Sequence, residues 1–273
     1  MKNAVYTQLS IIFHKKGLQI TFIIILLYAM SVSIWYGFLQ KGYDAAFMYH
    51  PAMLSALNGD SEFIWYFIRL FPFLVVIPAG FILFTDRSAK ISEMILVREG
   101  RFRYYTSKMI AAFIATFFVF TVPFFLEFLL NLVMIPNGAT MSLTNWETYS
   151  KVYFDYANGF LLSDIFYKNI YLYNICSISL TGIFSGCVAV FIVGISTFPF
   201  KFRAFLMLPF YVLIYLMDIF LSRIEMPTYL DFYIATFDIV GGKKISYYVL
   251  YMLLLLTTGI GCVFINVKRG CRL

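Results

Sequence analysis

Apolar runs of about 20 residues recur along this chain, and short polar segments separate them. The first run, Leu18 to Leu39, contains 22 residues and no charge. At 1.5 Å per residue, a helix of that length reaches about 33 Å, enough to cross the ~30 Å hydrocarbon core of a bilayer. The chain has 273 residues, of which 62% are hydrophobic and 13% charged, a composition typical of membrane proteins rather than of soluble domains.

Six such runs predict an all-α integral membrane protein that forms a single domain with six transmembrane helices. Within lipid, a helix satisfies its own backbone hydrogen bonds, so each run is expected to be helical. The expected spans are residues 18–39, 63–84, 109–134, 169–194, 204–221 and 245–266.

The distribution of Lys and Arg predicts that both termini face the cytoplasm, in a cell membrane. With the N-terminus inside, the cytoplasmic segments carry 14 of the 21 Lys and Arg residues, and the outer loops carry six. Positive charge is enriched on the cytoplasmic side of membrane proteins. Because the basic residues flank the apolar runs, the net charge of +7 favours the lipid bilayer as a partner rather than nucleic acid.

The segment ahead of the first run, residues 3–16, has apolar residues at helical spacing. Val5, Leu9 and Ile12 would share one face, with polar residues between them. This pattern predicts an interfacial helix that lies among the lipid headgroups and turns into the first span at Gly17. The alternative is a frayed cytoplasmic tail.

The sequence offers no catalytic or metal-binding motif. A phosphate-binding loop of an ATPase requires two spaced glycines followed by Lys and a hydroxyl residue, and the nearest fragment, residues 241–244, is too short. His14 and His50 fall on opposite sides of the predicted membrane. We therefore expect no catalytic residue, no metal and no cofactor in this chain, which is not expected to be an enzyme.

Two features within the spans suggest how the helices meet. Arg69 and Glu127 lie about 10 Å below the outer ends of the second and third spans, so the sequence predicts that they pair. Such a pair would be either a polar site on a translocation path or a structural bridge between helices. Gly182 and Gly186 form a GxxxG motif, which predicts close helix packing within the subunit or across a dimer.

The loop between the second and third spans, Thr85 to Lys108, has the pattern of a cytoplasmic helix. Ile91, Met94 and Ile95 share one helical face, and Glu99 with Gly100 ends the pattern. An apolar-faced helix outside the membrane favours docking into a groove of a partner protein. The alternative is a basic helix that rests on anionic lipid.

The layout of this chain resembles the permease subunits of ABC-2 type exporters. The shared order is an interfacial helix, a span, an outer loop, a second span, a charged cytoplasmic helix and a basic turn that ends in Ser-Lys. The resemblance implies that the cytoplasmic helix couples to a separate ATP-binding subunit, through Asp86, Arg87, Glu93, Leu96, Arg98, Arg101 and Lys108. The chain departs from the family at Lys90, where glycine is common, and at Glu99 and Gly100, which replace the usual proline.

The resemblance also implies a function. Two permeases, either two copies of this chain or this chain and a sister permease, would combine with two copies of the ATP-binding subunit, which would hold ATP and Mg. The assembly would export a hydrophobic or amphipathic substrate, and the outer loop from Ile135 to Lys168 would cap the exit, bind a peptide or form a lid. The alternative is a membrane protein without an ATPase, such as an ion-coupled carrier or an immunity or sensor protein.

Overall fold

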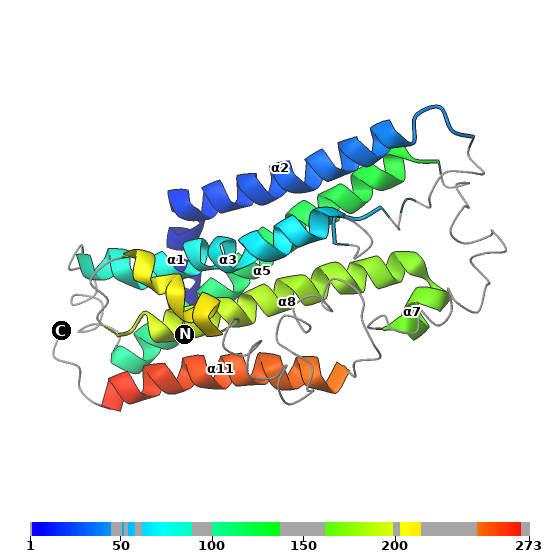
Figure 1. Cartoon of the computed structure of the whole chain (residues 1–273). Coiled ribbons are helices and arrows are strands. Elements are labelled where there is room, and N and C mark those ends of the chain that lie inside the picture. The colour runs from blue at the N-terminus through cyan, green and yellow to red at the C-terminus, as the bar shows by residue number, and fades with distance from the viewer. Residues whose placement is uncertain are drawn as a thin grey trace.

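The computed structural model describes residues 2–44, 51, 54–57, 62–88, 100–136, 162–198, 203–213 and 245–268. Within these ranges the chain is helical and contains no strand (Figure 1). The elements are α1 (Lys2–Phe13), α2 (Lys16–Leu39), α3 (Glu62–Ser88), α5 (Arg101–Met134), α7 (Ser163–Lys168), α8 (Ile170–Ile195), η4 (Arg203–Leu206) and α11 (Ile245–Lys268).

The five long helices, α2, α3, α5, α8 and α11, lie side by side in one bundle (Figure 1). Helix α8 is its centre, because it contacts α3, α5 and α11 and is buried along most of its length. Glycines on α8 allow the neighbouring helices to pack closely against it. A Cβ atom on Gly182 would meet Phe117 and Thr121 of α5, and one on Gly186 would meet Phe113.

Contacts at both ends of neighbouring helices give the direction of each helix. Helix α3 runs antiparallel to α2, and α8 runs antiparallel to α5. The contacts that define these two directions are Lys15–Asp86 and Tyr36–Phe63 for the first pair, and Gly186–Phe113 and Tyr171–Phe128 for the second.

Helices α8 and α11 are parallel. The backbone of Gly194 lies against that of Gly259, and the Asn266 side chain donates a hydrogen bond to the Thr197 hydroxyl. On α8 these contacts lie at the carboxyl end, and on α11 they lie in the second half of the helix. Helix α11 therefore begins at the end of the bundle opposite to the one at which α8 ends.

One end of the bundle contains the elbow, His14 and Lys15, at which α1 turns into α2. We call it the elbow end. Helices α2 and α5 begin there, and α3, α8 and α11 end there (Figure 1).

Phenylalanine rings form the core between α3, α5 and α8. Phe67 lies 5.1 Å from Phe124 and Phe71 lies 5.2 Å from Phe120, measured between ring centroids, and both pairs meet edge to face. Phe184 of α8 stacks on Phe71 at 5.8 Å. Such pairs contribute about 0.5–1.5 kcal/mol each beyond the area that they bury, so this cluster fixes the middle of the bundle.

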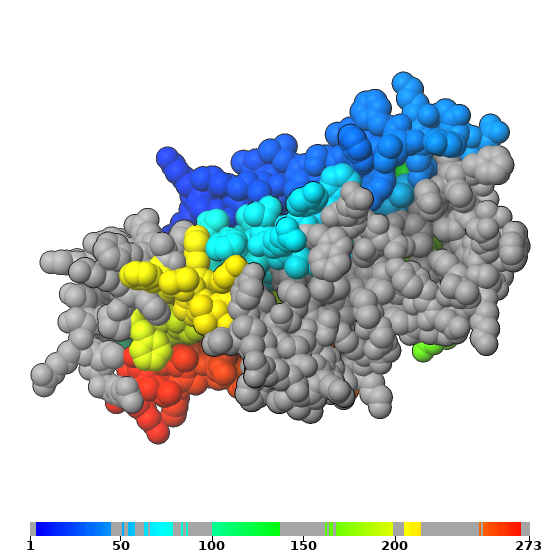
Figure 2. Space-filling model, viewed as in Figure 1, coloured from blue at the N-terminus to red at the C-terminus, as the bar shows by residue number. Residues whose placement is uncertain are grey.

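The outer faces of the bundle are apolar. Helix α2 exposes Ile20, Ile23, Ile24 and Leu27, and α11 exposes a similar stripe; Figure 2 shows α2 along one edge of the molecule. Soluble proteins rarely expose large continuous apolar patches. These faces suit contact with hydrocarbon.

The prediction of an all-α fold is confirmed for the described residues. Among them, four helices are long and apolar enough to cross a membrane: Lys16–Leu39, Arg101–Met134, Ile170–Ile195 and Tyr248–Lys268. They coincide with the first, third, fourth and sixth predicted spans. The second predicted span falls within α3, and the fifth, residues 204–221, is described only through residue 213.

Helix α1 covers most of the predicted interfacial segment, and it packs mainly against α5. Ala4, Gln8 and Ile12 form its buried face, while Tyr6 and Ile11 are exposed. The turn into α2 comes at the elbow, not at Gly17 as predicted. Gly17 is already helical, since the first turn of α2 includes it.

Candidate functional site

A cluster of polar side chains surrounds Asp86 at the elbow end of the bundle. The ammonium of Lys108 forms an ion pair with Asp86 Oδ2, and the Tyr104 hydroxyl donates a hydrogen bond of 3.1 Å to the same oxygen. Lys15 Nζ lies 3.6 Å from Oδ1. One carboxylate near the end of α3 thus joins the elbow and the first two turns of α5. We call these four residues the Asp86 cluster.

The local sequence explains how α5 presents its two members of the cluster. Gly100 has a φ of +78°, which glycine adopts without strain, and α5 begins at the next residue. Tyr104 and Lys108 are four residues apart, so they share one face of the helix. The Lys108 ammonium lies 4.7 Å from the centroid of the Tyr104 ring, which adds a cation–π contact.

Burial makes the ion pair important for stability. The Lys108 side chain is 0% exposed and that of Asp86 is 14% exposed. A buried ammonium is costly unless a carboxylate accompanies it, and removing one partner of a buried pair typically costs about 3–5 kcal/mol. The cluster therefore holds the end of α3 against the start of α5.

The structure brings together only some of the residues that the resemblance implies for coupling to an ATP-binding subunit. Asp86 and Lys108 meet, whereas Arg101 is exposed on the first turn of α5. Arg87 is the next-to-last residue of α3. Outside the described residues lie Ile91, Glu93, Met94, Ile95, Leu96 and Arg98.

Lys15 and Tyr104 are members of the cluster that the sequence interpretation missed. Lys15 was counted among the cytoplasmic basic residues and as part of the interfacial segment, residues 3–16, but not as a site residue. Tyr104 could have been found from its spacing of four residues to Lys108. No pattern in the sequence links either residue to Asp86.

A second polar site lies near the opposite end of α5. Glu127 is fully buried, and its Oε1 accepts a hydrogen bond of 2.6 Å from the backbone N–H of Ala56. One turn further along, the Asn131 amide donates to the carbonyl of Leu54 at 3.0 Å. These two side chains hold residues 54–57, a buried turn, against the helix.

The predicted pair of Arg69 and Glu127 does not form. Both ion pairs found among the described side chains involve Asp86, and Arg69 is exposed. Arg69 shares its face of α3 with Tyr66 and Phe73, which are exposed too. The prediction rested on matched depth, and depth does not determine which way a side chain points.

The glycines predicted to allow close packing make their contacts within the chain. Gly182 and Gly186 face α5, and Gly194, further along α8, faces Gly259 of α11. The alternative of a dimer contact at the GxxxG motif is therefore not needed to explain these residues.

We expect a stability test to separate Glu127 from Arg69. Replacing Glu127 with Ala leaves the buried N–H of Ala56 without its acceptor, which should lower the free energy of unfolding by about 1–3 kcal/mol. Glu127→Gln keeps an acceptor oxygen and should lose less. Unfolding in mixed detergent micelles measures both.

Arg69→Ala serves as the control, because its side chain is exposed. It should change the free energy of unfolding little and add to Glu127→Ala within about 0.5 kcal/mol. A coupling energy above about 1 kcal/mol between the two substitutions would show that Arg69 and Glu127 interact after all.

In the part of the chain that the structure describes, these features define an all-helical protein with four helices that are long and apolar enough to cross a membrane. No protein-family model, no curated protein and no solved structure matches the chain.

Proposed function

We propose that the chain is the transmembrane permease subunit of an ATP-driven exporter of the ABC-2 type, which moves a hydrophobic or amphipathic substrate out of the cell. The Asp86 cluster is the observation that carries the proposal. It ties together the two helices on either side of residues 89–99, which include most of the segment, Asp86 to Val97, that the resemblance implies for coupling. Asp86 and Lys108 are themselves among the residues that the resemblance implies for coupling.

The cluster gives the proposed coupling a physical route. A push on the coupling helix by an ATP-binding partner would act on the end of α3 and the start of α5 together, because Asp86 and Lys108 join them. Lys15 would carry the same displacement to the elbow. Rotation of these helices would shift the population from an inward-open to an outward-open state.

Six spans are part of this proposal, and the parallel course of α8 and α11 supports it. If both helices cross the membrane in the same direction, the chain between them crosses it an odd number of times. Residues 204–221 are the apolar run available for that crossing. Phe210 already lies beside Phe191 of α8, with 6.5 Å between the ring centroids.

The proposed orientation has the elbow end in the cytoplasm. The basic residues Lys16, Arg101, Arg103 and Lys268 lie at this end. Reporter fusions should therefore give an external signal at Asn58, Asn158 and Thr236 and a cytoplasmic signal at Glu93, Phe200 and the C-terminus. A cytoplasmic signal from residue 158 would rule out the six-span topology.

Charge on the apolar face of the coupling helix tests the function itself. Ile91→Asp combined with Ile95→Asp places two carboxylates where the proposal requires apolar contact with the partner, and desolvating them is costly. We expect copurification of an ATP-binding subunit and substrate-stimulated ATP hydrolysis to fall together. Membrane insertion should persist, since neither residue lies in a predicted span.

Charge reversal at Arg98, Arg101 and Arg103 is compared with the Ile91 and Ile95 variant, to distinguish docking on a partner protein from contact with lipid. If the helix rests on lipid instead, these changes should matter more than the isoleucine pair, and their effect should fade at high salt. Full partner binding by the Ile91 and Ile95 variant would remove the main support for the exporter.

A second candidate is an ATPase-independent membrane protein, such as an ion-coupled carrier, and Glu127 favours it. Its carboxyl group is fully buried and accepts a hydrogen bond from the backbone N–H of Ala56, with no ion pair among the described residues. Buried acids within spans often lie on ion pathways. Purified chain in liposomes distinguishes the two: uptake driven by an ion gradient without any ATP-binding subunit would support the carrier.

A further inference from the structure

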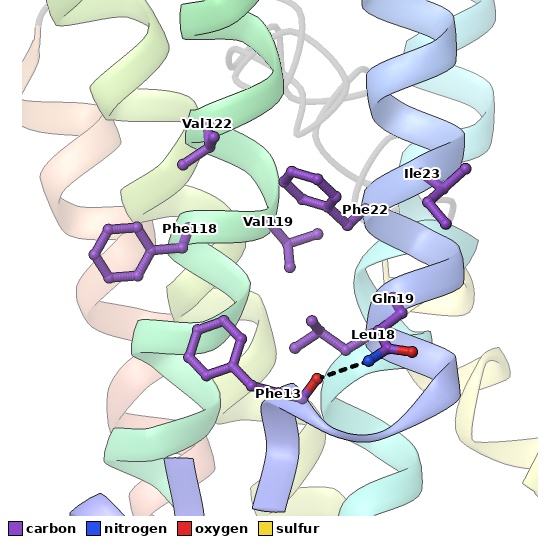
Figure 3. Close-up of a pocket in the computed structure, with 8 residues that line it drawn as sticks. All are labelled: Phe13, Leu18, Gln19, Phe22, Ile23, Phe118, Val119 and Val122. Atoms are coloured by element: carbon purple, nitrogen blue, oxygen red, sulfur yellow. Dashed lines mark hydrogen bonds between the residues drawn. The ribbon is translucent and has the colours of Figure 1, made fainter. Parts of the chain in front are cut away.

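An apolar groove of about 660 Å³ opens between α2 and α5, beside the elbow (Figure 3). Seven of the eight residues that line it are apolar. The exception, Gln19, donates a hydrogen bond of 3.4 Å to the carbonyl of Phe13. The groove has the volume of a small-molecule site, and its walls favour a hydrocarbon ligand.

Helices α2 and α5 form the walls of the groove, and α1 closes one end. Figure 3 shows Phe22 of α2 reaching toward α5, with Val119 on the opposite wall and Phe13, the last residue of α1, below them. The groove opens beside the exposed apolar face of α2. In a membrane, this opening faces acyl chains.

Positive charge lies next to the closed end. Lys16 is exposed at the elbow, and it precedes Phe22 by six residues, about 9 Å along the helix. Basic residues at a membrane surface attract anionic headgroups. A ligand with a hydrocarbon chain and an anionic head would match both parts of the site.

We propose that this groove binds one acyl chain of an anionic phospholipid from the leaflet at the elbow end, with the phosphate of its headgroup beside Lys16. The inference rests on the chain being embedded in a membrane and is independent of the exporter function. A spanning helix from a second copy fits less well, because a helix is about 10 Å wide and α1 lies across the end of the groove. An acyl chain enters from the side and does not need to pass α1.

The test uses the full-length chain in nanodiscs of phosphatidylcholine. Phosphatidylglycerol and phosphatidylcholine probes, each with a photoreactive group in the acyl chain, are compared at equal concentration. We expect the phosphatidylglycerol probe to label α5 between Phe118 and Val122 about fivefold more than the phosphatidylcholine probe, the preference that one lysine near the surface provides. Mass spectrometry of the peptides locates the label.

Two pairs of variants make the result specific. Lys16→Gln should abolish the preference, whereas Lys41→Gln, at the other end of α2, should retain it. Val122→Trp fills the groove and should remove labelling by both probes. Its control is Ile260→Trp on the exposed face of α11, which should leave the labelling unchanged.

Several outcomes would overturn the proposal. These are equal labelling by the two probes in the unmodified chain, a preference that survives Lys16→Gln, and cross-links through the groove to a second copy of the chain. Because Lys16 is exposed, its replacement should not disturb folding. The labelling preference of the Lys16→Gln variant therefore tests the proposal even if Val122→Trp fails to fold.

Discussion

Asp86→Ala should lower the free energy of unfolding by about 3 kcal/mol. The substitution leaves the fully buried ammonium of Lys108 without its carboxylate. Removing one partner of a buried pair costs about 3–5 kcal/mol, and the lower value applies here because Asp86 keeps some contact with solvent. Denaturant titration of the purified chain in detergent measures the loss.

Two further variants identify the cause. Adding Lys108→Met to Asp86→Ala removes the buried charge and should recover most of the lost stability. Lys15→Gln should cost no more than about 1 kcal/mol, because Lys15 is partly exposed and lies further from the carboxylate. If Asp86→Ala costs as little as Lys15→Gln, the cluster does not stabilise the bundle.

Gly194→Val should destabilise the packing of α11 on α8 by at least about 3 kcal/mol. A Cβ atom at Gly194 would overlap the backbone of Gly259, and a backbone cannot rotate out of the way as a side chain can. Overpacking in a core typically costs about 1–3 kcal/mol, and a backbone clash falls at or above the upper end. The same detergent titration detects the effect.

Gly261→Ala is the matched control on α11. An added Cβ there meets no atom within 4 Å, so stability should stay within about 1 kcal/mol of the unmodified chain or rise, since alanine favours helix over glycine. Disulfide trapping between Thr197→Cys and Asn266→Cys gives a second readout. Trapping that is equally fast with Gly194→Val would show that the two helices do not depend on this close approach.

The positions of the long helices could be predicted from hydropathy alone. The predicted span 169–194 differs by one residue at each end from α8, and 245–266 begins where α11 begins. A bilayer requires about 20 apolar residues per crossing, so the pattern in the sequence is strong. The third span was less accurate: α5 begins at Arg101, eight residues before the predicted start, because the helix continues past the apolar run.

The contacts between helices could not be predicted in the same way. Arg69 and Glu127 were matched by depth, yet Glu127 bonds to the backbone of Ala56 and Arg69 points outward. Hydropathy gives no information about which face of an apolar helix is buried when every face is apolar. Lys15 was missed for a related reason, because its link to Asp86 joins segments 71 residues apart in the chain.

The parallel course of α8 and α11 has a consequence for how the chain is made. The two helices lie against each other, but the hydrogen bond between Thr197 and Asn266 joins residues 69 positions apart. During synthesis, Gly194 of α8 therefore remains without its partner, Gly259, until α11 has been made. The described bundle thus cannot be completed by pairing each helix with its neighbour in the order of the chain, because the contact between α8 and α11 forms only once α11 is present.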